Sequence, residues 1–344
     1  MSRTIVAEEP SNAVAGPPSS GQPHASSSLR RFAWFVLAYN ILVILWGGVV
    51  RASGSGAGCG DQWPLCQGAA IPQSPQFHTI VEFTHRLMSG GALILIAALL
   101  VWIWSATTKG SLARWSAVAS LVLVLNEAFL GALLVTVAAH SGSQVTAVSV
   151  FSCHLANTLL LLAALALTAE FLSMSRRYRM TALRHGSLIF PALAILTTLL
   201  TGITGSLVAL GETLYPSPTL LAAIRQDFSP AAPLLLRLRW IHPVTAFIAG
   251  AFVAWLLVQA FRHTAPSKAR SLGIAVLVTI LAQYLLGVAD VLLRAPIWLQ
   301  ILHLLGADLF WIFLILLAAD YCLVEKSPKH KSNRETLATV VNGG

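Results

Sequence analysis

The chain has 344 residues, of which 56% are apolar or aromatic (Ala, Val, Ile, Leu, Met, Phe, Trp, Tyr and Cys) and only 10% are charged. So few charges cannot cover a water-soluble domain, in which about 25% of residues are charged, and so apolar a chain is not disordered over most of its length. The net charge of +9 suggests nucleic acid only weakly, because in a chain with a mean hydropathy of +0.75 basic residues more often mark cytoplasmic loops.

Eight apolar segments predict an all-α polytopic membrane protein with eight transmembrane helices. Each segment supplies the ~20 residues that a helix needs to cross a bilayer core. Each is also continuous, whereas the strands of a membrane β-barrel alternate between polar and apolar residues. The predicted spans are residues 32–51, 78–104, 112–138, 145–172, 187–210, 236–261, 271–293 and 296–322.

Two polar segments flank the predicted spans. Residues 1–31 are rich in Ser, Pro, Ala and Gly, and we expect them to form a disordered cytoplasmic tail. They contain no apolar stretch of the kind that marks a cleavable signal peptide. Residues 324–344 are expected to form a second cytoplasmic tail.

The distribution of Lys and Arg predicts the orientation of the spans. With the N-terminus in the cytoplasm, 16 of the 22 basic residues fall on the cytoplasmic side and 5 on the outer side, and Arg86 lies inside the second span. Basic residues concentrate in the cytoplasmic loops of membrane proteins. We therefore expect a multi-pass protein of the bacterial cell membrane with both termini in the cytoplasm.

The two halves of the membrane region carry similar motifs in the same order, which predicts two repeat-related four-helix bundles. The bundles span residues 32–172 and 187–323, with a cytoplasmic linker at 173–186. Since four spans return the chain to the same side, the repeat is parallel. The matching features are Gly47-Gly48 with Gly202 and Gly205, His85 with His242, Asn126–Gly131 with Ala282–Gly287, and His154 with His303.

Four histidines inside the spans are candidate haem ligands. They lie about two helical turns from the outer end of their spans, and so at similar depth. Two His from two antiparallel helices of a four-helix bundle can ligate a haem iron. The four are His85, His154, His242 and His303.

Other roles for these histidines are weighed against haem ligation. A single intramembrane His is often only a hydrogen-bonding residue between helices, and a proton relay is a further alternative. Four His at matched positions favour haem instead. Zinc is disfavoured, because neither pair has nearby Cys or carboxylate ligands beyond Glu82.

The charged neighbours of the histidines differ between the halves. Glu82 stands three residues before His85, and Arg239 stands three residues before His242. Residues i and i+3 share a helix face. The N-terminal half therefore offers a carboxylate for proton transfer, and the C-terminal half a guanidinium suited to a haem propionate. In the alternative interpretation, both side chains are merely solvated at the level of the lipid headgroups.

A second carboxylate lies deeper in the membrane region. Glu127 is well inside the third span, and its counterpart in the second half is Gln283. A carboxylate at this depth is usually functional or well paired. We favour a neutral or hydrogen-bonded side chain over a direct catalytic role.

Cys59 and Cys66 lie in the first outer loop, within Gly54-Ser-Gly-Ala-Gly-Cys-Gly-Asp-Gln-Trp-Pro-Leu-Cys66. The outer compartment of a bacterial cell is oxidising, so a disulfide is expected there. Its role is open between a structural staple and a redox relay to the N-terminal site.

Taken together, these features resemble the haem A synthase family of cytochrome oxidase assembly, over about residues 32–322. The most specific are the Gly-Ser-Gly-x-Gly-Cys…Trp-Pro-Leu-Cys loop, the run Glu82-Phe-Thr-His-Arg86, the eight spans and the four matched His. Gly60 and Glu127 depart from the family pattern, in which Pro and Gln are commoner.

The resemblance implies an oxidoreductase that converts haem O into haem A by hydroxylating the C8 methyl group successively to a formyl group. His85 and His154 match the family's binding site for the substrate haem O. His242 and His303 match the axial ligands of a permanent haem b. Glu82 matches the essential carboxylate. A haem O synthase and an electron donor or acceptor are implied partners, and a homo-oligomer is a further expectation.

Two other classes of function remain as alternatives. A di-haem b cytochrome that only transfers electrons across the membrane would place its haems at two depths, whereas the four His share one. A transporter with His-based proton coupling would contain no haem at all.

Overall fold

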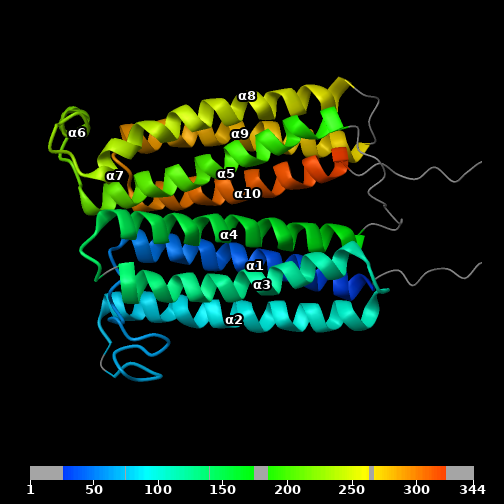
Figure 1. The fold of residues 1–344 in the computed structure, drawn as a ribbon, viewed down its shortest axis with the longest axis horizontal. Helices are drawn as coiled ribbons and strands as arrows, with labels where there is room; N and C mark the ends of the chain where they lie inside the picture. The colour runs from blue at the N-terminus through cyan, green and yellow to red at the C-terminus, as the bar shows by residue number, and fades with distance from the viewer. Residues whose placement is uncertain (1–25, 74, 139, 174–184, 263–266, 323–344) are drawn as a thin grey trace, which may run out of the picture.

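Long helices lie side by side along one axis in the computed structural model, which describes residues 26–73, 75–138, 140–173, 185–262 and 267–322 (Figure 1). Eight of the described helices are long and apolar enough to cross a membrane. The elements are α1 Ser27–Ala52, α2 Phe77–Ala106, α3 Leu112–Leu133 with the π-helical turn η1 Leu134–Ala138, α4 Gln144–Ser173, α5 His185–Leu214, α6 Leu220–Asp227, α7 Leu234–Arg237, the 3-10 turn η2 Leu238–Trp240, α8 Ile241–Arg262, α9 Ser267–Leu292 and α10 Ile297–Cys322.

The predicted all-α polytopic membrane fold is confirmed, with differences at the helix ends. Residues 27–31, expected in the N-terminal tail, already belong to α1. The side chain of Ser26 accepts a hydrogen bond from the Leu29 amide at 3.2 Å, which satisfies a free N–H group at the helix start. The tails 1–25 and 323–344 and most of the expected linker, 174–184, lie outside the described residues.

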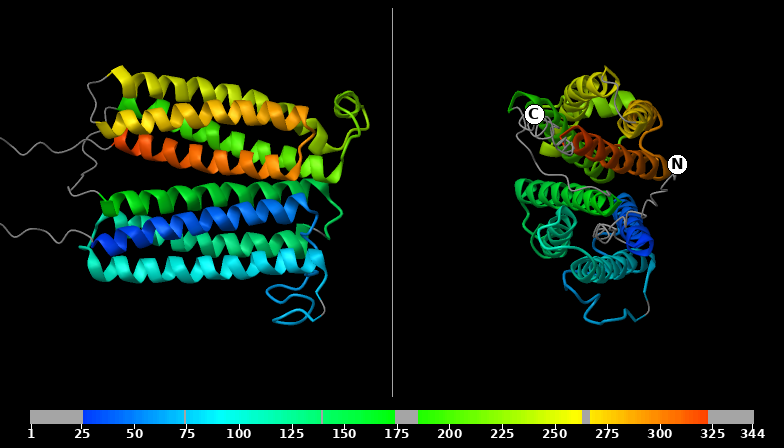
Figure 2. Two further views of the ribbon diagram at one scale, coloured as in Figure 1. Left: turned by 180° about the vertical axis from the view of Figure 1, so that it is seen from behind. Right: turned by 90° about the vertical axis from the view of Figure 1, so that its right-hand side faces the viewer.

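The spans form two groups of four that lie against each other (Figures 1 and 2). The helices α1 to α4 form one group, and α5, α8, α9 and α10 form the other, with α1 and α4 meeting α5 and α10 between them. The division of the chain into two bundle domains stays a prediction, as does their origin in a repeat.

The helix α10 packs closely across the seam between the groups. Trp311 of α10 is 1% exposed and belongs to the same apolar core as Leu162 of α4. Its indole N–H donates to the Leu159 carbonyl oxygen at 2.7 Å. Nearby, a Cβ atom on Gly48 of α1 would lie 2.8 Å from Cδ2 of Leu304 of α10. Because Gly48 has no side chain, α1 can approach α10 closely at this point.

The described residues between α1 and α2 (53–73, 75 and 76) lie at one end of the array, which we call the loop end (Figure 1). The helices α2, α4, α8 and α10 all begin at this end, and α6 and α7 lie there too. The expectation that the two His of each bundle come from antiparallel helices is therefore wrong. One span separates α2 from α4 and α8 from α10, so the two members of each pair run in the same direction.

We expect Trp311→Phe to lower the thermal unfolding midpoint of the detergent-solubilised protein. The substitution removes the N–H group that joins α10 to α4, and hydrogen bonds between membrane helices contribute about 1–2 kcal/mol at most. The matched control is Trp115→Phe, because Trp115 is 67% exposed on α3. Equal midpoints for the two variants would contradict a stabilising role for this contact.

Candidate functional site

Each of the four predicted histidines packs its ring against a glycine of a neighbouring helix. An added Cβ atom on Gly47 or Gly205 would crowd Cε1 of the imidazole, so these two glycines make room for the ring, whereas a Cβ on Gly131 or Gly287 would lie at ordinary contact distance. The distances from that Cβ to Cε1 are 3.0 Å for Gly47 and His85, 3.8 Å for Gly131 and His154, 2.8 Å for Gly205 and His242, and 3.4 Å for Gly287 and His303.

The histidines form two pairs, one in each group of helices. His85 of α2 and His154 of α4 are close enough to interact electrostatically, and so are His242 of α8 and His303 of α10. All four lie in the half of the array nearer the loop end, as their positions early in these helices require. The structure thus brings together, within each group of helices, the two histidines that were expected to share one haem.

Their ring nitrogens fit a role as haem ligands. The Nδ1 atoms of His85, His154 and His303 are buried and have no hydrogen-bond partner among the described residues. Buried polar atoms normally have one. In the described part of the chain, no three or more His, Cys, Asp or Glu side chains gather into a metal-binding group. Donors that come in pairs suit haem iron, whose other ligands are porphyrin nitrogens, better than zinc.

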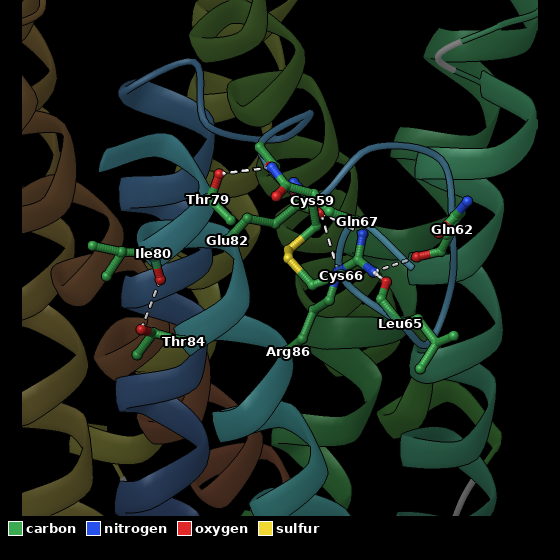
Figure 3. The surroundings of a disulfide bond; sticks show 11 residues. Cys59, Gln62, Leu65, Cys66, Gln67, Thr79, Ile80, Glu82, Thr84 and Arg86 are labelled. Carbon is green, nitrogen blue, oxygen red and sulfur yellow. Dashed lines mark hydrogen bonds and ion pairs between the residues drawn. A yellow bond between two sulfur atoms is a disulfide. The ribbon is translucent and has the colours of Figure 1, made fainter. Parts of the chain in front are cut away.

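Glu82 is buried, with 3% of its surface exposed, so the interpretation as a solvated headgroup residue is wrong. Its Oε2 accepts a hydrogen bond from the Cys59 amide at 2.8 Å. Its Oε1 accepts one from Nη2 of Arg86 at 2.6 Å, one helical turn further along α2. The carboxylate therefore lies between the helix that carries His85 and the loop that follows α1 (Figure 3).

The same loop is closed by the disulfide between Cys59 and Cys66, which are almost fully buried. The guanidinium of Arg86 holds the far side of the loop, donating to the carbonyl oxygens of Gln62 at 2.8 Å and Leu65 at 2.7 Å (Figure 3). Glu82, Arg86 and the disulfide are thus one connected unit at the loop end of α2.

Arg239 is also buried, at 8% exposed, and is already paired. It contacts Asp227 of α6 at 2.9 Å and Glu212 of α5 at 3.2 Å. Burial raises the pKa of the Asp227 carboxyl, and the Arg239 charge opposes that rise. Arg239 lies in η2 and not in α8, because the ring of Pro243 would clash with its carbonyl in a regular α-helix.

One contact of the site was missed in the sequence. Glu127 of α3 lies with its Oε1 3.4 Å from Nε2 of His154. The signal was the spacing of His154, Asn157 and Thr158, which places three polar side chains on one face of α4. Asn157 and Thr158 both bind the Glu127 carboxylate.

Arg51 was counted only as a basic residue of the outer side. It belongs to α1 but binds the other group of helices, through the Ala209 carbonyl at 2.8 Å, Thr213 at 3.1 Å and Gln300 at 2.7 Å. It therefore joins the two groups near the loop end.

We expect Gly58→Ala to disturb the disulfide loop. A Cβ atom at this position would lie 2.7 Å from the Thr79 amide nitrogen and closer still to the His78 carbonyl, and neither backbone group can move aside easily. Mass spectrometry without reductant should detect an increased fraction of free Cys59 and Cys66 thiols. Gly56→Ala is the control, because a Cβ there meets nothing within 4 Å. A fully oxidised pair in both variants would contradict this.

Comparison with known proteins gives relatives of two kinds. A protein from Thermus thermophilus named protoheme IX farnesyltransferase is 42% identical over 301 residues, which cover 86% of this chain and 49% of that protein. A heme A synthase from Bacillus cereus is 27% identical over 316 residues, covering 87% and 93% of the two chains. A heme A synthase from Alkalihalophilus pseudofirmus is 40% identical over 94 residues, covering 27% and 31%.

The chain thus spans about half the length of the Thermus protein and nearly all of the Bacillus one. The family model described as cytochrome oxidase assembly protein matches residues 30–315, and so includes all four histidines, Glu82 and the disulfide loop. The chain belongs to the COX15-CtaA family of cytochrome oxidase assembly proteins.

Proposed function

We propose that the protein is a haem A synthase, an oxidoreductase of the membrane that converts the C8 methyl group of haem O to a formyl group. The observation that carries the proposal is the pair of glycine-backed histidine sites, of which only one has a buried carboxylate three residues before its first His. The name of the full-length Bacillus relative, heme A synthase, supports the same assignment.

In this proposal, His242 and His303 hold a permanent haem b between α8 and α10. The bound haem would supply one-electron chemistry. The Nδ1 atom of His242 lies 3.1 Å from the Thr201 carbonyl oxygen, which orients its ring. Arg239 is the proposed partner of a haem propionate, which it would bind in addition to Glu212 and Asp227.

His85 and His154 bind the iron of the substrate, haem O, in the other group of helices. Glu82 lies one turn before His85 and is proposed to take up a proton as the methyl group is oxidised. Arg86 forms an ion pair with the carboxylate through Oε1, and the Cys59 amide donates a hydrogen bond to Oε2. The disulfide would serve as the staple that holds this amide, and a redox relay is its alternative role.

The surroundings of the reaction follow from the fold and from the relatives. The loop end would face the outer side of a bacterial cell membrane, with both termini in the cytoplasm, as the distribution of basic residues predicts. The relative named protoheme IX farnesyltransferase is about twice as long as the region that matches this chain, so in that protein a region like this chain is joined to further sequence. We therefore propose a farnesyltransferase as the source of haem O. An electron donor or acceptor completes the set of proposed partners.

We expect His242→Ala and His303→Ala each to remove haem b from the purified protein. The visible spectrum and the extracted pigments measure this directly. His140→Ala is the control, because this residue is exposed at the loop end. Full retention of haem b in both variants would refute its ligation by these residues. Two haem b per chain and no haem O or haem A would favour the di-haem cytochrome.

We expect Glu82→Gln to lower haem A production by about 10²–10⁴-fold, the usual contribution of a general acid or base. The amide still accepts the Cys59 N–H bond but cannot take up a proton. Production is measured by pigment extraction at equal expression.

Arg86→Gln is the matched control for the Glu82 variant. It breaks the same ion pair and leaves the carboxylate in place. If both variants lose haem A production equally, and both also lose the disulfide, Glu82 only holds the loop.

A further inference from the structure

The carboxylate that touches a histidine of the N-terminal site is Glu127, and the surrounding side chains hold it firmly. Thr158 donates to its Oε1 at 2.5 Å, and Asn157 donates to its Oε2. Asn157 also donates to the Leu123 carbonyl oxygen at 2.9 Å and accepts a hydrogen bond from Asn126 at 2.8 Å. Both donors are nearly buried, at 5% and 8% exposed.

In this arrangement the Glu127 side chain accepts two hydrogen bonds and has one further polar contact. A carboxylate has about four lone-pair positions, and here two neutral donors occupy part of them. The remaining neighbour is Nε2 of His154, 3.4 Å from Oε1. An imidazole that points one nitrogen at a carboxylate has the other nitrogen free for iron, and the carboxylate fixes the ring and makes it more electron-rich.

The second group of helices lacks this network at the corresponding place. Gln283 of α9 stands where α3 has Glu127, and Gly306 and Ala307 of α10 stand where α4 has Asn157 and Thr158. The amide nitrogen of Gln283 is buried over Gly306 and has no hydrogen-bond partner among the described residues. The two His pairs therefore differ in what surrounds them as well as in Glu82 and Arg239.

We propose that Glu127 is a positioning residue of the N-terminal site, which acts on the substrate through His154. This inference rests on the proposed function, because it takes His154 as a ligand of haem iron. The Glu127 carboxylate lies against Nε2 of His154 and holds the ring in one orientation, while Asn157 and Thr158 hold Glu127. Iron bound to His154 is then more electron-rich than iron bound to His303, which has no such partner among the described residues.

The test is a titration of purified full-length protein, isolated with its resident haem, with ferric protohaem. Absorbance gives the affinity of the second haem, and a redox titration gives its potential. We expect Glu127→Gln to weaken binding of the second haem by about 10–100-fold, the usual effect of removing such a partner. We also expect a more positive potential, because the negative charge beside His154 is lost.

Two further variants make the result specific. Thr158→Val removes one donor to Glu127 and should shift affinity and potential in the same direction by a smaller amount, and it serves if Glu127→Gln does not fold. Gln283→Ala changes the corresponding residue of the other group and should leave the affinity and the potential of the second haem unchanged. Retention of the resident haem by each variant reports an intact fold.

His154→Ala separates the two proposals. If it still binds the second haem with unchanged affinity, the proposed substrate site itself is wrong. If it abolishes binding while Glu127→Gln and Thr158→Val keep the affinity within about twofold and the potential unchanged, the substrate site stands and the role of Glu127 is refuted.

Discussion

A polar side chain inside a membrane-spanning helix has to find its partner within the protein, because the hydrocarbon around it offers none. The organisation of this protein follows from that constraint. Glu82 contacts Arg86 and a backbone amide, Arg239 contacts two carboxylates, and Glu127 contacts three side chains of α4. The buried polar atoms that have no hydrogen-bond partner among the described residues are then informative. They include a ring nitrogen on three of the four central histidines.

Glycines give those histidines their places. A ring as large as imidazole fits between two closely packed helices only where the facing helix has no side chain. The structure places a glycine against the ring four times, with a different pair of helices each time, and at Gly47 and Gly205 a Cβ atom would crowd the imidazole. Gly205 is the tightest case, since even a methyl group there would lie 2.8 Å from the His242 ring. The histidine sites are therefore built from pairs of helices, and each depends on the packing of its whole group.

The differences between the two groups of helices explain how similar sites would serve different purposes. Near the loop end, α2 carries a carboxylate clamped to a disulfide loop, whereas the turn before α8 carries an arginine clamped to two acids. Deeper in the array, α3 and α4 share a polar network around His154, whereas α9 and α10 have an amide over a glycine. A resident cofactor needs a stable, charge-balanced pocket. A substrate that is to be oxidised also needs groups that move protons and tune its iron.

The eight spans can be predicted from the sequence alone, because a membrane helix is the only structure in which each long apolar segment can satisfy its backbone. The candidate histidines can be predicted too, since their matched spacing places them at one depth along helices of fixed rise.

The sequence left open the direction in which buried charged side chains point. Glu82 could face water or protein from its sequence position, and Glu127 looked isolated. Both points depend on contacts that form only in the folded protein. The partners of Glu82 are a loop closed by Cys59 and Cys66, and the partners of Glu127 are residues about 30 positions away on α4. Such contacts depend on how helices rotate and pack against one another, and periodicity along one helix does not fix that rotation.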